Sequence, residues 1–183
     1  LPISKSLECD IFIGAGSQAE YGRGSGEIDE TYETSPTTEY GKAKLMAYEK
    51  LKIIAKENNM KFIWTRIFSV YGIYDYQGTL VMSALDKMKR NENIPLTQCI
   101  QSWDFIYVED VARAMYLLAS TPCMDGIYNI ASGTSRQLKD FIMDMKDICK
   151  STSKLQFGAI PYNAEGVISF EIGRASCRER VYG

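Results

Sequence analysis

A tyrosine and a lysine lie four residues apart at the start of a long helical pattern, at Tyr40 and Lys44. On an α-helix this spacing places both side chains on one face, one turn apart. A phenol has a pKa of about 10, and lowering it to near neutrality takes about 4 kcal/mol of stabilisation by positive charge. Lys44 is the cation that this spacing supplies. The pair therefore predicts a tyrosine that exchanges protons beside a lysine, although the same spacing is also common on helices without such a role.

A serine follows an apolar, strand-like run upstream of that pair. The run ends in Gly14-Ala15-Gly16, and Ser17 comes directly after it. We expect the strand to carry the Ser17 hydroxyl to the rim of a sheet, where it would donate to a substrate oxygen. Two glycines at a strand end would also allow a ligand to approach the backbone closely. Ser17, Tyr40 and Lys44 are thus the candidate catalytic residues.

Two motifs in this order are similar to a known family. The segment from Gly16 to Gly22 is followed, 23 residues after Ser17, by Tyr-x-x-x-Lys. This arrangement resembles the short-chain dehydrogenase/reductase superfamily, and more narrowly its extended branch, the NAD-dependent epimerase/dehydratase family acting on nucleotide sugars. The resemblance implies NAD or NADP as cofactor and a nucleotide sugar as substrate. It also implies that Tyr40 and Lys44 contact the cofactor and that the protein forms a homodimer.

Further site residues follow from the same resemblance. The run Arg-Ile-Phe followed by Tyr-Gly implies that Ile67 and Phe68 lie near the nicotinamide. Ser17, Gln18 and Ser69 are implied substrate-binding residues, with Ser69 standing where many relatives have asparagine. Trp103 stands where many relatives have an arginine that grips the diphosphate.

The residues after Ser17 bear on the reaction. Relatives that carry out 4,6-dehydration have Asp and Glu there, whereas this chain has Gln18 and Ala19. An amide and a methyl group cannot act as acid and base. We therefore expect a 4-ketoreductase or 4-epimerase rather than a dehydratase. Glu20 stays open as an acid or base, although on a continuing strand it would alternate away from Ser17. A non-catalytic dinucleotide-binding sensor or scaffold, and an inactive fragment, also stay open.

The first half of the chain predicts a strand, a crossover helix and a second strand. We expect a strand at 9–13, a loop at 22–38, a helix from Thr38 to about residue 59, and a strand at 61–68. The inward stripe of the helix comprises Ala43, Ala47, Leu51 and either Ile54 or Ala55, with Tyr40 and Lys44 on the same stripe. This order is typical of a parallel α/β sheet. With the resemblance, it predicts a Rossmann-like parallel sheet lacking its N-terminal strands, with a small C-terminal substrate-binding lobe.

The second half alternates in the same way. We expect a helix at 78–90, and then a strand-like entry at 103–109 feeding a helix capped by Asp110. A short strand follows at 126–131. Thr134 or Ser135 would cap a helix that runs to Cys149, and a last strand covers 155–160.

Composition excludes several classes of protein. The chain has 183 residues and a formal net charge of −2, with 21 basic and 23 acidic residues intermixed. This balance argues against nucleic acid as a partner, and no apolar run approaches the roughly 20 residues of a membrane span. Histidine is absent, which removes histidine-based triads and most zinc sites, and we expect no metal. The five scattered cysteines suggest reduced thiols in the cytoplasm, and we expect the first four to be buried.

The two ends of the chain differ in character. Residues 1–170 fit the C-terminal part of an NAD(P)-dependent epimerase/dehydratase domain, because no glycine-rich strand-to-helix turn precedes Ser17. Residues 171–183, which include Cys177, are rich in arginine and lack periodicity. We expect them to be a non-native tail and exclude them from the fold.

Overall fold

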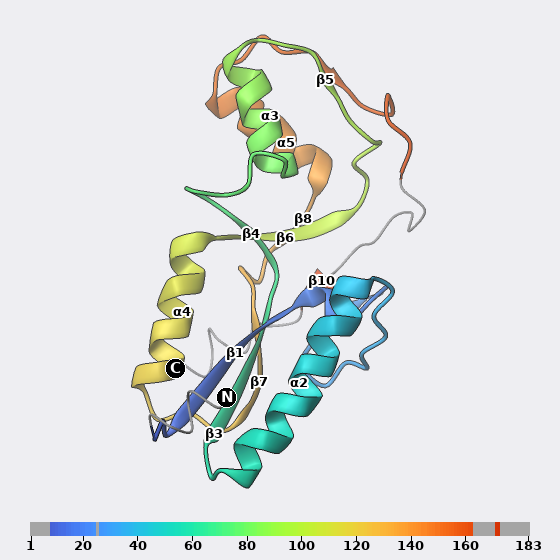
Figure 1. The fold of residues 1–183 in the computed structure, drawn as a ribbon. Coiled ribbons are helices and arrows are strands. Elements are labelled where there is room, and N and C mark those ends of the chain that lie inside the picture. Colours follow the sequence, from blue (N-terminus) through green and yellow to red (C-terminus); the bar gives the residue numbers. More distant parts are fainter. Residues whose placement is uncertain (1–7, 25, 163–170, 173–183) are drawn as a thin grey trace.

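A three-stranded parallel sheet forms the first of two lobes in the computed structural model, which describes residues 8–24, 26–162 and 171–172 (Figure 1). Its strands are ordered β1 (Ile11–Ser17), β3 (Lys61–Ile67) and β7 (Gly126–Ile130). Ser17 pairs with Ile67, so the two strands end at the same edge. The predicted parallel α/β arrangement is confirmed.

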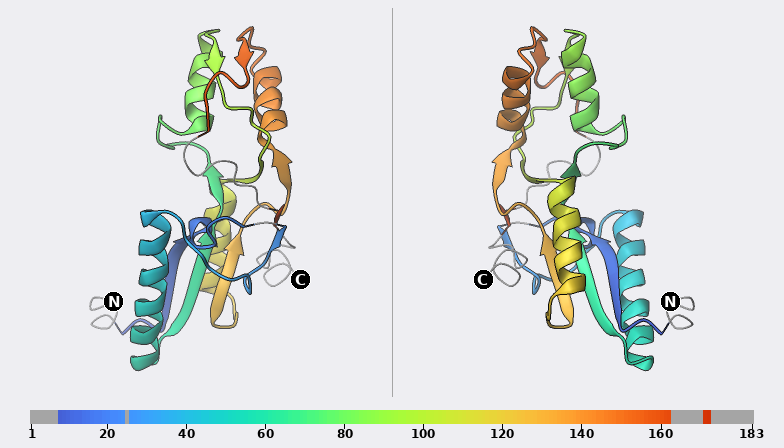
Figure 2. Two further views of the ribbon diagram at one scale, coloured as in Figure 1. Left: turned by 90° about the vertical axis from the view of Figure 1, so that its right-hand side faces the viewer. Right: turned by 90° about the vertical axis from the view of Figure 1, so that its left-hand side faces the viewer.

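Two helices cover opposite faces of this sheet, as the two side views show (Figure 2). Helix α2 (Glu39–Glu57) packs on one face through a cluster that includes Ala55, Phe62 and Trp64. Helix α4 (Val108–Ser120) packs on the other through a cluster that includes Ile63 and Leu118. Because successive strand residues point to opposite faces, Phe62 and Ile63 serve different cores. A strand buried on both faces reads as a continuous apolar run, which is why its sequence was informative.

A second three-stranded sheet joins this lobe to the next. Its order is β4 (Ser69–Tyr71), β6 (Ser102–Tyr107) and β8 (Ser135–Gln137), with β4 and β6 parallel and β8 antiparallel to β6. One residue, Phe68, separates β3 from β4. The chain therefore passes from one sheet to the other almost without interruption.

The second lobe contains two helices around a separate apolar core. Helix α3 (Leu80–Lys89) and helix α5 (Leu138–Ile148) contribute Val81, Met88 and Ile142 to it. Two short strands, β5 (Ile94–Pro95) and β9 (Leu155–Gln156), pair beside these helices. The predicted second lobe is present, in the upper part of Figure 1.

Several element boundaries differ from the sequence predictions. Strand β1 does not end at Gly14 but continues through both glycines to Ser17. The predicted strand at 155–160 is reduced to Leu155–Gln156. The loop at 22–38 contains a two-residue strand, β2 (Glu27–Ile28), which pairs in parallel with β10 (Glu171–Ile172). Two residues of the expected tail, Glu171 and Ile172, thus form a strand. The rest of that tail, residues 173–183, lies outside the described residues.

Two predicted helix caps are wrong. Helix α4 starts directly after β6 with Tyr107 as its N-cap, so Asp110 lies inside the first turn and does not cap it. Ser135 begins strand β8, and helix α5 follows with Gln137 as N-cap. In both places a strand of the joining sheet, β6 or β8, runs directly into the helix, which leaves no loop residue to act as a side-chain cap.

The predicted inward stripe of α2 is confirmed at Ala47, Leu51 and, of the two alternatives at its end, Ala55, and it is wrong at Ala43. Ala43 is exposed, and Ile54 is exposed whereas Ala55 is fully buried. Tyr40 also lies outside the core, with 58% of its surface exposed. The first turn of the helix therefore presents its side chains to solvent.

The four cysteines among the described residues form no disulfide bonds but differ in burial. Cys99 is buried, Cys9 and Cys123 are half-buried, and Cys149 is exposed, so the expectation of burial is wrong for Cys149. Burial raises the pKa of the Cys99 thiol.

Within the described residues, no helix combines the length and apolar character that crossing a membrane requires.

Candidate active site

Ser17 lies at the carboxyl end of β1, where the strand passes into the short turn η1 (Gln18–Glu20). The backbone N–H of Ala19 donates to Ser17 Oγ at 3.2 Å. The backbone N–H of Ser17 donates to Glu20 Oε1 at 2.8 Å. Because Ser17 Oγ acts as an acceptor in this turn, the hydroxyl hydrogen is available for a ligand oxygen.

Glu20 is fully buried and holds a structural position that the sequence reasoning missed. Its carboxylate accepts hydrogen bonds from Trp64 Nε1 and, at 3.0 Å, from Arg66 Nε. The expected alternation away from Ser17 is wrong, because the chain leaves the strand geometry at Gln18. The signal was present in the sequence, since Ser17-x-x-Glu20 has the spacing of a capping box.

The two glycines of β1 accommodate a side chain rather than a ligand. A Cβ at Gly14 would lie 2.2 Å from the Trp64 ring, and one at Gly16 would lie 2.3 Å from Trp64 Nε1. The indole of Trp64 therefore covers the strand where close ligand approach was expected. Removal of Cβ groups makes this packing possible.

Tyr40 and Lys44 lie in the first turns of α2, beside the Ser17 turn. The hydroxyl of Thr38 caps this helix by accepting from the Gly41 N–H at 3.0 Å. Lys44 Nζ donates to the carbonyl oxygen of Ala15 at 2.8 Å and lies 5.6 Å from the centre of the Tyr40 ring. The lysine thus connects the tyrosine to the end of β1, two residues before Ser17.

Gly41 allows the helix to approach the turn this closely. A Cβ at position 41 would lie 2.3 Å from the carbonyl oxygen of Ala19. Any larger residue would separate the first turn of α2 from η1. The structure therefore brings Tyr40, Lys44 and Ser17 to the carboxyl edge of the sheet, where open α/β sheets bind ligands.

Gln18 and Ser69 are brought together across the junction of the two lobes. Gln18 Nε2 donates to Ser69 Oγ at 3.1 Å. Ile67 is half-buried against the α4 face, and Phe68 is 3% exposed, packed against Tyr21 and Ile28. The cofactor contact of Ile67 and Phe68 stays a prediction.

A cavity of about 480 Å³ continues from Ser69 into the second lobe. Val70, Leu96 and Trp103 contribute apolar walls, and Gln101 contributes an amide. Among the described residues that line it, none is basic and Asp75 is the charged one. Such a lining suits the uncharged part of a ligand better than its phosphates.

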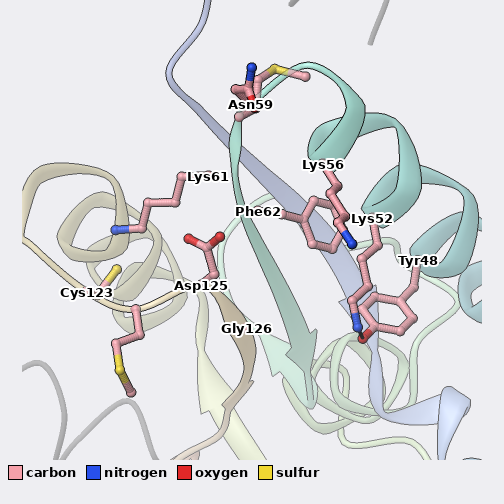
Figure 3. Close-up of a pocket in the computed structure, with 11 residues that line it drawn as sticks. Tyr48, Lys52, Lys56, Asn59, Lys61, Phe62, Cys123, Asp125 and Gly126 are labelled. Carbon is pink, nitrogen blue, oxygen red and sulfur yellow. Dashed lines mark hydrogen bonds between the residues drawn. The ribbon is translucent and has the colours of Figure 1, made fainter.

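A larger hollow of about 850 Å³ lies at the opposite end of the sheet (Figure 3). It opens at the amino ends of β3 and β7, at Lys61 and Gly126, and its walls include Tyr48, Lys52 and Lys56. Lys52 Nζ donates to the Tyr48 hydroxyl at 3.1 Å. None of the predicted site residues lines this hollow, so size alone does not mark the candidate site.

The described residues hold no group of three or more metal-ligating side chains that could bind a metal ion.

Most of the chain matches one known protein family. Residues 3–131 match the model of the NAD dependent epimerase/dehydratase family. The chain belongs to this family.

Two curated relatives within this epimerase/dehydratase family are more than 30% identical. CDP-abequose synthase of Salmonella muenchen is 33% identical over 124 residues, which cover 66% of this chain and 42% of the relative. The dTDP-4-dehydro-6-deoxyglucose reductase of Escherichia coli is 32% identical over 171 residues, which cover 90% of this chain and 53% of the relative. The chain thus spans about half the length of these relatives.

Solved structures agree on the epimerase/dehydratase fold. UDP-N-acetylglucosamine 4-epimerase from Methanobrevibacter ruminantium M1 is 20% identical with a TM-score of 0.88, and the match covers 98% of this chain and 59% of that one. UDP-glucose 4-epimerase from Thermotoga maritima is 22% identical with the same TM-score and the same coverage. At this identity the likeness shows the fold, and the predicted Rossmann-like class is confirmed.

Proposed function

We propose that this chain supplies the catalytic residues of an NAD(P)-dependent enzyme that reduces a 4-keto nucleotide sugar. The observation that carries the proposal is the attachment of the first turns of α2, which hold Tyr40 and Lys44, to the end of β1, which holds Ser17. The Lys44 hydrogen bond to Ala15 and the close approach of Gly41 to Ala19 hold the helix and the strand end together. Neither contact follows from the spacing of the residues in the sequence.

Each side chain has a distinct task in this proposal. Tyr40 exchanges a proton with the oxygen on C4, and its 58% exposure leaves the ring open to a ligand. Ser17 donates its hydroxyl hydrogen to the same oxygen. Lys44 places a positive charge beside Tyr40 and offers its remaining hydrogens to the cofactor ribose.

The residues present fit a nicotinamide dinucleotide at this edge. Tyr40 and Lys44 offer a hydroxyl and an ammonium group at the carboxyl end of parallel strands, which is where such folds bind dinucleotides. When bound, the cofactor supplies the hydride chemistry. NAD and NADP are both compatible with the described residues.

Reduction is favoured over dehydration by the residues of the turn. Gln18 is hydrogen-bonded to Ser69, and Ala19 donates its N–H to Ser17, so neither provides an acid or a base. The Escherichia coli relative is named as a reductase of a 4-dehydro sugar nucleotide, which supports the same choice. Epimerisation at C4 is the second candidate, because the same three side chains serve oxidation and reduction at one carbon.

The uncharged nucleoside part of the substrate would enter the cavity beyond Ser69, where no described lining residue is basic, and this would make the second lobe the substrate-binding lobe. Homodimer formation through α2 also stays a proposal. Met46 and Ile53 expose 53% and 58% of their surfaces on this helix, which is compatible with a partner there.

Replacing Tyr40 by phenylalanine tests the proposal in the full-length natural protein. Consumption of reduced nicotinamide would be followed with a panel of nucleotide 4-keto sugars. Loss of the proton carrier should lower kcat by roughly 10²–10⁴-fold, with cofactor affinity nearly unchanged. Tyr116→Phe is the matched control, because Tyr116 is 71% exposed on α4, and it should leave kcat unchanged.

The outcomes separate the candidate functions. Activity of Tyr40→Phe within tenfold of the natural protein would show that Tyr40 is not the proton carrier. Interconversion of nucleotide sugars epimeric at C4, without net consumption of cofactor, would favour the epimerase. Cofactor binding without turnover of any substrate in either assay would favour a sensor or scaffold.

A further inference from the structure

A carboxylate with no access to solvent lies directly beneath the Ser17 turn. Glu20 is 0% exposed, and its oxygens accept hydrogen bonds from the Ser17 N–H at 2.8 Å, Trp64 Nε1 at 3.1 Å and Arg66 Nε at 3.0 Å. All of these donors point inward from β1 and β3. Because Glu20 reaches no surface, it cannot touch a substrate, and a role as acid or base is removed.

The positive partner of this carboxylate is buried as well. Arg66 is 3% exposed, and its guanidinium lies 4.4 Å from the centre of the Tyr21 ring. A buried ion pair offers little net stability over apolar packing, but loss of one partner leaves an uncompensated charge. Removal of Glu20 or Arg66 alone would therefore leave a buried charge without its partner.

The network extends from this pair to the third strand of the sheet. The Tyr21 hydroxyl donates to Asn129 Oδ1 at 2.7 Å, and Asn129 lies on β7. The Asn129 N–H donates to Glu30 Oε1 at 2.7 Å. Residues following β1 are thus tied to β3 through Glu20 and to β7 through Tyr21.

We propose that Glu20 is a positioning residue for Ser17, an inference that rests on the proposed function. Glu20 fixes the backbone N–H of Ser17, and the turn that it completes directs the Ala19 N–H onto Ser17 Oγ. With its oxygen used as an acceptor, the Ser17 hydroxyl presents its hydrogen outward. The buried charge thereby sets the direction in which Ser17 donates.

A double-mutant cycle in the full-length natural protein tests this inference. Glu20→Gln keeps the shape but turns an amide donor toward Trp64 or Arg66. It should lower kcat roughly tenfold or more with little change in KM, because a displaced donor is a poorer catalyst. In a Ser17→Ala background the same change should alter kcat by less than about twofold, since the group that Glu20 positions is already absent.

Leu118→Ala is the control for a purely structural effect. Leu118 is 0% exposed in the α4 core, so the substitution lowers stability without touching the Ser17 turn. It should leave kcat nearly unchanged below its unfolding transition. Equal losses of kcat from Glu20→Gln in both Ser17 backgrounds would overturn the inference.

A milder variant covers the case in which Glu20→Gln fails to fold. Trp64→Phe removes one donor to the carboxylate and keeps an aromatic ring above the glycines. It should lower kcat in the Ser17 background and not in the Ser17→Ala background, and equal effects would again contradict the inference. If Tyr40→Phe stays active, the proposed function fails instead, and the two failures are distinguishable.

Discussion

At the scale of single residues, Trp64 shows how one side chain organises the site. Its ring occupies the space above Gly14 and Gly16, and its N–H donates to the buried Glu20 carboxylate. The same residue packs against Phe62 and Tyr48 in the core under α2. A core tryptophan whose N–H finds a partner can therefore link hydrophobic packing to the geometry of a polar turn.

The cysteines give a prediction at this scale. Alkylation of the native protein should modify the exposed Cys149 first and the buried Cys99 last, with rates that differ at least roughly tenfold. Burial both blocks access to Cys99 and raises its pKa, which lowers the fraction of reactive thiolate. Peptide mass spectrometry of a time course would measure the order. Denatured protein is the control, and a difference that persists there would contradict the explanation by burial.

At the scale of elements, the first turn of α2 is held at both of its ends. Thr38 caps it, and Lys44 fastens it to Ala15 of β1. Gly41 makes the contact with η1 possible. A helix normally loses stability from glycine, so the residue serves the contact and not the helix.

Replacing Gly41 by alanine should therefore destabilise the protein. Helix propensity alone favours alanine by about 1 kcal/mol. The added Cβ would lie 2.3 Å from a backbone oxygen, which we expect to reverse the sign and cost about 1–3 kcal/mol. Thermal unfolding would measure the change, with Lys42→Ala on the exposed face as control. An increase in melting temperature for Gly41→Ala would show that the contact is not maintained in solution.

The elements also show what could be predicted from the sequence. Apolar runs identified β3 and β7, and the helical period identified α2, α3 and α5, because each signal comes from burial of one local face. The caps at Asp110 and Ser135 could not be predicted, since β6 and β8 pair with segments distant in the sequence and run directly into α4 and α5. The indole above Gly14 was likewise invisible, because Trp64 is 50 residues away.

At the scale of the whole molecule, the buried Asp104 secures the junction of the lobes. It lies on β6 and is 2% exposed. Its two oxygens accept from the N–H groups of Ser132 and Thr134, at 2.7 and 2.9 Å. The carboxylate thereby fixes the segment that connects β7 in one lobe to β8 in the joining sheet.

Asp104→Asn should lower stability because an amide offers one acceptor and turns a donor toward the other N–H. We expect the free energy of unfolding to fall by about 1–3 kcal/mol. Each kcal/mol should lower the melting temperature by roughly 2–4 °C. Asp144→Asn is the control, since Asp144 is 53% exposed in a surface pair with Arg136 and should change little. Equal shifts for the two variants would mean that the buried contacts add nothing.

The three-stranded junction has a mechanical consequence. The main chain crosses between the lobes at Phe68, at Tyr107 and between Ile130 and Ser135, and the strands adjoining these crossings are hydrogen-bonded to one another. Rotation of one lobe away from the other would have to break backbone hydrogen bonds between β4, β6 and β8. We expect the cavity beyond Ser69 to keep nearly constant dimensions, so that ligands enter and leave it without a large movement of either lobe.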